Sequence, residues 1–301
     1  MFPRPHVHVG RRTSHVASVV VMRVIDAHIH VQPFEMLKPD VRETFWYNKP
    51  NRAELEALAA DPRKLLAQMD ADGIERVGLI NYVSPDVMGF TAECNEWMIR
   101  YASADRSRLI PFGSVHPGFT GDVAGETRRI IDAGAAAFKV HPPHQTFRAN
   151  AYLHEMPSLA ELYRECEVAG IPVTIHTGTS VFPGARSRLG DPMDVDDVAV
   201  DFPKLKILLA HGGRPLWMEA AFFVVRRHPN VFLEVSGIPP AKLLKYFPRI
   251  EELAHKTIWG TDWPSPGVKS MRQNVEQFLA LPLGDQSKRA ILYDNAAGLF
   301  S

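Results

Sequence analysis

The stretch VIDAHIH, residues 24–30, decides how the fold of this chain is predicted. It is a short apolar run that ends in His28 and His30, and side chains two positions apart on a β-strand point to the same side. Both imidazoles can therefore bind one metal ion, for which neutral histidine is a common ligand. The pattern is weak alone, because His6 and His8 repeat it near the N-terminus, where we expect no metal site. Its meaning depends on what the other strands carry at their ends.

Seven further apolar, β-branched runs follow the first one, separated by helix-like segments. The eight strands are predicted at 23–28, 77–82, 109–115, 136–141, 172–176, 206–211, 231–235 and 257–262. Strands that alternate with amphipathic helices indicate βα units in a parallel sheet, and eight such units indicate a closed barrel. We therefore predict an α/β protein with a single (β/α)8 TIM barrel over residues 23–301.

The longest connection is a predicted loop after the first strand, at about 31–51, and it carries Phe45, Trp46 and Tyr47. This aromatic cluster is interpreted either as a substrate lid over the barrel mouth or as a hydrophobic anchor. The helix ends are marked more clearly. Asp61-Pro62 predicts a capped helix start, Ser158 with Glu161 predicts a capping box, and glycines 73 and 170 predict helix ends.

Composition excludes several classes of function. Lys plus Arg equals Asp plus Glu at 34 each, which argues against nucleic acid or an anionic membrane as partner. No apolar run reaches the roughly 18 to 20 residues of a membrane span. Two cysteines, Cys94 and Cys166, suit a reducing cytoplasm better than a disulfide scaffold. Residues 1–22 are predicted to be a disordered extension, and Met22 is an alternative start.

Polar residues end five of the predicted strands, which is where a TIM barrel builds its active site. They are His28 and His30 on the first strand, then Lys139 with His141, His176, His211 and Asp262. Each has a structural alternative when taken alone: a core histidine, a strand-end cap, or a lysine stem packed in the barrel. Their coincidence favours a site, because buried polar groups need partners. His28, His30, His176 and Asp262 are predicted to converge on one divalent ion.

This order of residues, together with the phrases DAHIH, FKVHPP, IHTG, AHGGRPLW, WGTDWP and DNAAGLF, resembles the amidohydrolase superfamily. Over 24–300 it is most similar to the amidohydrolase-related branch, which includes relatives of aminocarboxymuconate-semialdehyde decarboxylase, resorcylate-type decarboxylases and several hydrolases. The resemblance implies a divalent metal, expected to be Zn²⁺, that activates water. It implies that Asp262 binds the metal and shuttles a proton, and that His211 polarises the substrate or acts as acid and base.

The resemblance leaves two metal counts open. In the favoured one, a single ion is held by His28, His30, His176 and Asp262. In the other, Lys139 is carbamylated and bridges two ions. Lys139 in its unmodified form is a further candidate, as a cation for a substrate carboxylate.

Substrate contacts are predicted at His141, Arg148, Arg214, Trp263 and Trp46, with either arginine able to hold a carboxylate through a bidentate contact. Asp26 is predicted to orient a metal-binding histidine. The favoured function is hydrolysis of a small amide, ester or lactone. The alternative is non-oxidative decarboxylation of an aromatic or enoic carboxylic acid. A non-catalytic barrel is disfavoured, because every expected ligand position is filled. The branch implies a homodimer or homotetramer.

Overall fold

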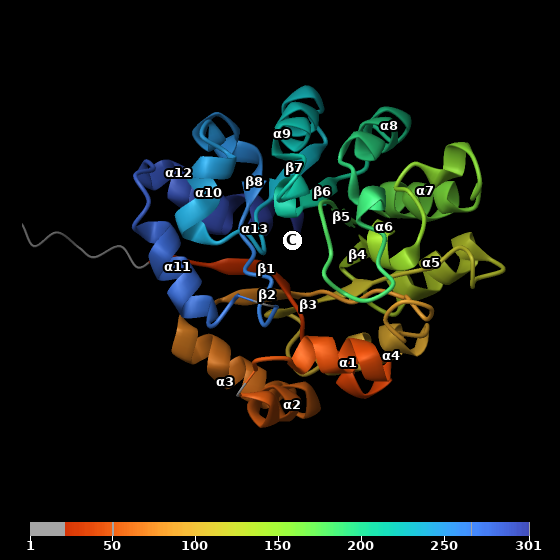
Figure 1. The fold of residues 1–301 in the computed structure, drawn as a ribbon, viewed down its shortest axis with the longest axis horizontal. Helices are drawn as coiled ribbons and strands as arrows, with labels where there is room; N and C mark the ends of the chain where they lie inside the picture. Colours follow the sequence, from red (N-terminus) through yellow and green to blue (C-terminus); the bar gives the residue numbers. More distant parts are fainter. Residues whose placement is uncertain (1–21, 50, 266, 301) are drawn as a thin grey trace, which may run out of the picture.

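The computed structural model describes residues 22–49, 51–265 and 267–300. Its centre is one sheet of eight strands in the order β1 to β8, with every neighbouring pair parallel (Figure 1). The strands are β1 (Ile25–Ile29), β2 (Arg76–Leu79), β3 (Leu109–Gly113), β4 (Ala137–Val140), β5 (Val173–His176), β6 (Ile207–Ala210), β7 (Val231–Glu234) and β8 (Thr257–Ile258). All eight predicted strands are present, mostly shorter than predicted.

The two edges of the sheet meet, which makes it a barrel. The residues around β8 bond to β1 through Ala27 N to Trp259 O at 3.0 Å and Asp262 N to His28 O at 2.8 Å. His30 N also donates to Trp263 O at 2.7 Å. The predicted (β/α)8 TIM barrel is thereby confirmed, and the closure places the end of β1 beside Asp262.

Helices surround the barrel, as Figure 1 shows. They are α1 (Pro39–Trp46), α2 (Arg52–Ala60), α3 (Pro62–Asp72), α4 (Glu93–Ala102), α5 (Val123–Asp132), α6 (Pro142–Gln145), α7 (Leu159–Ala169), α8 (Met193–Asp201), α9 (Met218–Arg227), α10 (Pro240–Tyr246), α11 (Met271–Leu279), α12 (Asp285–Arg289) and α13 (Asn295–Leu299). Short helical turns are η1 (Phe34–Met36), η2 (Ala151–Leu153), η3 (Ser187–Gly190), η4 (His211–Gly213), η5 (Ile250–Lys256) and η6 (Ala290–Asp294). Strands buried on both faces suit this arrangement, because helices cover the outside and side chains fill the inside.

The sequence signals for helix ends are largely confirmed. The Asp61 side chain accepts from Arg63 N at the start of α3, and α3 ends at Gly73 with φ 71°. Gly170 ends α7 with φ 69°, in the left-handed region that glycine adopts without steric cost. The predicted capping box at Ser158 is wrong, because Ser158 itself has helical backbone angles and its side chain caps no backbone N–H.

The connection after β1 is not the loop that was predicted, because it folds into η1 and α1 before α2 begins. The rings of Phe34, Phe45 and Trp46 pack against one another at centroid distances of 4.8–5.1 Å, and all three are buried. Phe45 and Trp46 therefore anchor this segment through packing, while Phe45 also lines the cavity at the carboxyl ends of the strands. Tyr47, by contrast, is 76% exposed.

Three further predictions concern the N-terminal segment, the two cysteines and membrane-spanning helices. The extension predicted over 1–22 lies, apart from Met22, outside the described residues. Cys94 and Cys166 are both buried free thiols. Among the helices of the described residues, each is too short or too polar to cross a bilayer.

Candidate active site

A cavity of about 320 Å³ opens at the carboxyl ends of the strands. This is the end of a TIM barrel at which the βα loops build active sites. Of the predicted site residues, seven line the cavity: His30, Lys139, His141, His176, His211, Arg214 and Asp262. These seven residues come from five different strand ends, those of β1, β4, β5, β6 and β8.

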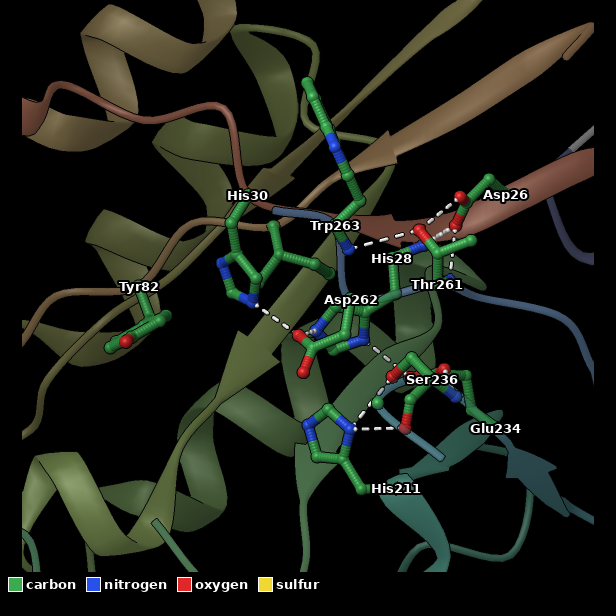
Figure 2. A network of polar contacts seen from close by, with 12 residues as sticks. Asp26, His28, His30, Tyr82, His211, Glu234, Ser236, Thr261, Asp262 and Trp263 are labelled. Atoms are coloured by element: carbon green, nitrogen blue, oxygen red, sulfur yellow. Dashed lines mark hydrogen bonds and ion pairs between the residues drawn. The ribbon is translucent and has the colours of Figure 1, made fainter. Parts of the chain in front are cut away.

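His28, His30 and Asp262 form the centre of the site. The Nε2 atoms of His28 and His30 lie 3.5 and 3.0 Å from Asp262 Oδ1 (Figure 2). Ligand atoms of His28, His211 and Asp262 all lie within 4.8 Å of one another. Asp262 after β8 thus lies beside His28 and His30 at the end of β1, and His211 after β6 lies close to His28 and Asp262, whereas the predicted binding of one ion by His28, His30, His176 and Asp262 stays a prediction.

The donor atoms of this cluster fit a divalent cation. Among the described residues, His28 Nε2 and both ring nitrogens of His176 are buried without a hydrogen-bond partner. Buried nitrogen atoms without partners are costly, and a bound cation would satisfy them. Imidazole nitrogen and carboxylate oxygen are also the ligand types that zinc and similar metals take at catalytic sites.

The histidines of the site are held in the neutral form that binds metal. Burial lowers the pKa of His28, His176 and His211 well below the ordinary value, and the nearby charge of Lys139 acts in the same direction. Asp262 behaves in the opposite way. Its burial alone would raise its pKa, but the hydrogen bond from His30 and the neighbouring positive charges outweigh burial and hold the pKa well below its usual range. Asp262 is therefore an ionised carboxylate at neutral pH.

Two of these strand-end residues have unusual backbone angles. His211 has φ 65° and Asp262 has φ 67°, in the left-handed region that is uncommon for residues other than glycine, although histidine and aspartate adopt it more often than most. Such strain tends to concentrate at functional sites, where the surrounding structure imposes it. At His211 the following Gly212 and Gly213 also have positive φ, so the chain turns sharply and leaves the imidazole at the strand end.

β7 contributes two residues that the sequence interpretation missed. Glu234 Oε2 lies 2.6 Å from His28 Nδ1, and both Ser236 O and Ser236 Oγ lie 2.9 Å from His211 Nδ1 (Figure 2). Each imidazole is thus bonded through Nδ1, which leaves its Nε2 free. A signal was present in the sequence, because Glu234 is a charged residue that ends an otherwise apolar strand.

Lys139 lies at the bottom of the cavity and is 0% exposed. Its Nζ atom has no hydrogen-bond partner within the described part of the chain. Burial lowers the pKa of Lys139, while the carboxylates of Glu234 and Asp262 act against this. The amine of Lys139 is therefore buried at the cavity without a direct hydrogen-bond partner among the described residues.

A stack of three imidazoles, those of His141, His144 and His176, forms part of the cavity wall. The ring centroid of His141 lies 3.6 Å from that of His144 and 3.9 Å from that of His176. His144 is fixed at both ends, with Nδ1 2.8 Å from Tyr82 Oη and Nε2 2.7 Å from Ser180 Oγ. His141, predicted to touch substrate, is thus supported from behind and lines the cavity.

Positive charge dominates the cavity lining. Lys139, Arg214 and Lys242 line it, whereas Asp262 is its acidic residue. Arg214 is held in place by Nε donating to Gly237 O at 2.7 Å and by Nη2 lying 3.2 Å from Asp262 Oδ2. An anionic substrate is therefore favoured over a cationic one.

Three predicted substrate contacts are not brought to this cavity. Arg148 instead pairs with Asp194, its Nη1 lying 2.9 Å from Asp194 Oδ1. Trp46 packs in the aromatic anchor and borders other surface hollows. Trp263 is 5% exposed, and its backbone N donates to Thr261 Oγ1 while its side chain is absorbed into the core. Core packing therefore accounts for the positions of the Trp46 and Trp263 side chains, and an ion pair outside the cavity accounts for that of Arg148.

Asp26 does not orient a histidine ring as predicted. Its Oδ1 accepts from Thr261 N at 2.9 Å and from His28 N at 3.2 Å, and its Oδ2 accepts from Thr261 Oγ1 at 2.6 Å (Figure 2). Asp26 therefore ties the backbone of β1 to the segment after β8. Burial raises the pKa of Asp26 to about 7, although the hydrogen bonds from Thr261 and His28 oppose this.

Asp26 should make the metal-free protein less stable as pH rises. Its pKa is higher in the folded state than the ordinary value of 3.8, so its contribution is complete below 3.8 and is lost as pH rises through about 7. We expect the free energy of unfolding, measured with urea, to fall by roughly 2–3 kcal/mol between pH 5 and pH 8 from this group. Asp26→Asn should remove this slope, because asparagine does not titrate, and its amide can still bond to both Thr261 and His28. An equal slope in the two proteins would contradict the prediction.

The chain matches the model of the amidohydrolase family over residues 25–301, and it therefore belongs to this family. No curated protein matches the sequence. Among solved structures, 5-carboxyvanillate decarboxylase from Sphingomonas paucimobilis is 18% identical with a TM-score of 0.69, over 93% of this chain and 99% of that one. A probable 2-pyrone-4,6-dicarboxylic acid hydrolase from Acinetobacter baumannii is 16% identical with a TM-score of 0.65, over 93% and 99%. A 5-carboxyvanillate decarboxylase from Novosphingobium aromaticivorans, solved with manganese, is 16% identical with a TM-score of 0.63, over 93% and 96%. At these identities the likeness establishes the shared fold.

Proposed function

We propose that this member of the amidohydrolase family is a metal-dependent hydrolase of a small substrate that carries a carboxylate. The observation that carries the proposal is the position of Asp262, a buried carboxylate whose Oδ1 lies 3.5 and 3.0 Å from Nε2 of His28 and His30 and whose Oδ2 lies 3.2 Å from Nη2 of Arg214. Hydrolysis needs a base that takes a proton from the attacking water, and an ionised carboxylate at the bottom of a cavity supplies one.

The residues around Asp262 have complementary tasks in this proposal. His211 donates Nδ1–H to Ser236 O, so its Nε2 carries a lone pair that faces the site. Nε2 can accept a proton, and in its protonated form it can polarise a substrate group. Arg214 and Lys242 hold the substrate carboxylate at the cavity wall. Phe45, Tyr82, Phe182 and Tyr246 line the rest of the cavity and offer apolar and aromatic contacts to a flat substrate.

His28, His30, His176 and Asp262 would hold the divalent ion, as the unpartnered nitrogens of His28 and His176 support. The ion, when bound, supplies Lewis-acid activation of water and of a carbonyl at neutral pH. Zinc and manganese both accept these ligands. The other residues then bind the substrate, exclude water and move the proton.

We expect elemental analysis of the purified protein to give close to one divalent metal per chain. The reason is that Glu234 and Ser236 direct His28 and His211 towards a single small region beside Asp262. A ratio near two that falls on Lys139→Ala would instead support a carbamylated lysine bridging two ions.

Decarboxylation is the second candidate, and the excess of positive charge in the cavity favours it. A decarboxylase must bind the carboxylate that it removes and must then protonate the carbon. Lys139, buried at the bottom of the cavity, is a cation placed to do either. The ionised state of Asp262 argues the other way, since an acid is needed at that step.

The two reactions are separated by isotope labelling. We would load the full chain with Zn²⁺ or Mn²⁺ and offer 2-pyrone-4,6-dicarboxylate, 5-carboxyvanillate and 2,6-dihydroxybenzoate in water enriched in ¹⁸O. Hydrolysis puts ¹⁸O into the organic product, whereas decarboxylation releases CO₂ and puts solvent hydrogen on carbon. Turnover that is lost with a chelator and that labels the product supports hydrolysis. Release of CO₂ without label in the organic product would reverse the order of the two candidates.

A further inference from the structure

Glu234 contacts the site from outside the cavity. It is the last residue of β7 and is 1% exposed, and it is not among the residues that line the cavity. Its two oxygens have different partners, since Oε2 lies 2.6 Å from His28 Nδ1 while Oε1 accepts from Ser236 N at 2.8 Å. Both oxygens of this carboxylate are therefore required as acceptors.

A glycine on the neighbouring strand end gives this contact its space. A Cβ atom at Gly260 would lie 2.7 Å from Glu234 Oε1 and 2.8 Å from His28 Cβ. Side chains do not approach this closely, so a larger residue at 260 would separate Glu234 from His28. The close contact between Glu234 at the end of β7 and His28 on β1 therefore requires a glycine at position 260, after β8.

We infer that Glu234 is a positioning residue that holds His28 in the tautomer with its proton on Nδ1. An ionised carboxylate only accepts hydrogen bonds, so above a pH of about 7, to which burial raises the pKa of Glu234, the ring nitrogen that faces it must carry the proton. Nε2 then presents a lone pair beside Asp262, whose Oδ1 is 3.5 Å away. The inference rests on the proposed function, because it assumes that this lone pair binds a divalent ion.

Glutamine is the sharpest replacement, because it preserves shape and removes one acceptor. In one orientation of the amide, Ser236 N–H would donate to the amide oxygen, and the amide NH₂ would then face His28 Nδ1. Since NH₂ only donates, Nδ1 would become the acceptor and the ring proton would move to Nε2. The opposite amide orientation would place NH₂ against Ser236 N–H. The first orientation satisfies both contacts but puts the ring proton on Nε2, which removes its lone pair, and the second leaves Ser236 N–H without an acceptor.

Metal affinity tests the inference without any substrate. We would titrate Mn²⁺ into the metal-free full chain and into its Glu234→Gln variant, following free Mn²⁺ by electron paramagnetic resonance. We expect Mn²⁺ binding to weaken by about 10- to 100-fold in the variant, the usual range for loss of a group that orients a metal-binding histidine. Asp194→Asn is the matched control, because it removes a buried carboxylate that pairs with Arg148 away from the cavity, and its affinity should equal that of the wild type.

A second measurement needs neither metal nor the variant. Selective ¹⁵N labelling of histidine, with His28→Asn used to assign the signal, reports which nitrogen of His28 is protonated in the metal-free wild type. Protonation at Nδ1 supports the inference, and protonation at Nε2 overturns it. If the wild type binds Mn²⁺ and the Glu234→Gln variant binds it with the same affinity, the inference is also overturned. A wild type that binds neither Mn²⁺ nor Zn²⁺ would contradict the proposed function instead, and the tautomer would still test Glu234.

Discussion

Replacing Asp262 with asparagine is expected to lower kcat about 100- to 10,000-fold, which is the usual range for loss of a general base or acid. The substitution keeps the shape of the side chain and an oxygen that can face His28 and His30. It removes the negative charge that the hydrogen bond from His30 and the neighbouring charges maintain. The loss should therefore be in kcat, measured on whichever probe carboxylate the wild type converts, with a smaller change in KM.

The matched control for this experiment is again Asp194→Asn, since Asp194 is buried and ion-paired but lies outside the cavity. It should retain wild-type kcat. Metal content should be measured in parallel, because Asp262 is also a proposed ligand. A kcat within threefold of wild type in metal-loaded Asp262→Asn would show that another group takes the proton, with His211 the next candidate.

The sequence predicted the barrel and the positions of most of its polar strand ends because both depend on local pattern. An apolar run that ends in a histidine or an aspartate is visible without any knowledge of contacts, and the topology of the fold then brings these ends together. His28, His30, His176, His211 and Asp262 were all found in this way. Their roles in catalysis and metal binding stay predictions.

What the sequence could not supply was the pairing between residues that are distant along the chain. Asp26 and Glu234 are both carboxylates on strands, and the pattern alone favoured Asp26 as the partner of a histidine ring. The structure gives that contact to Glu234, 206 positions away from His28, and gives Asp26 the backbone of Thr261 instead. The choice depends on the barrel stagger and on the space left by Gly260.

Arginines were the least predictable site residues. Arg148 and Arg214 both follow strand ends, yet Asp194 on α8 pairs with Arg148, whereas Arg214 is directed into the cavity by Gly237 O. A long, flexible side chain reaches whichever partner lies within its range, so its target depends on the surroundings rather than on its position in the strand. Trp46 was misplaced for a related reason, because its ring packs with Phe34 and Phe45.

Arg214→Gln is expected to raise KM by roughly tenfold to hundredfold on a carboxylate substrate, corresponding to about 1.5–3 kcal/mol for a lost hydrogen bond to a charged group. The guanidinium lines the cavity and is held rigidly by Gly237 O and Asp262. A rigid fork of donors loses little freedom when it binds a carboxylate, so its contribution to binding is large.

Lysine should not restore the function of Arg214. It has no counterpart to the Nε donor that bonds to Gly237 O, and its single charged nitrogen cannot contact Asp262 and a carboxylate with the same geometry. Arg214 is also among the charges that keep the pKa of Asp262 low, so its loss should raise that pKa and move the acid limb of the kcat–pH profile upwards. We therefore expect Arg214→Lys to keep much of the low pKa of Asp262 while KM stays raised, whereas Arg214→Gln changes both. A wild-type KM in either variant would place the substrate carboxylate elsewhere in the cavity, which Lys139 and Lys242 also line.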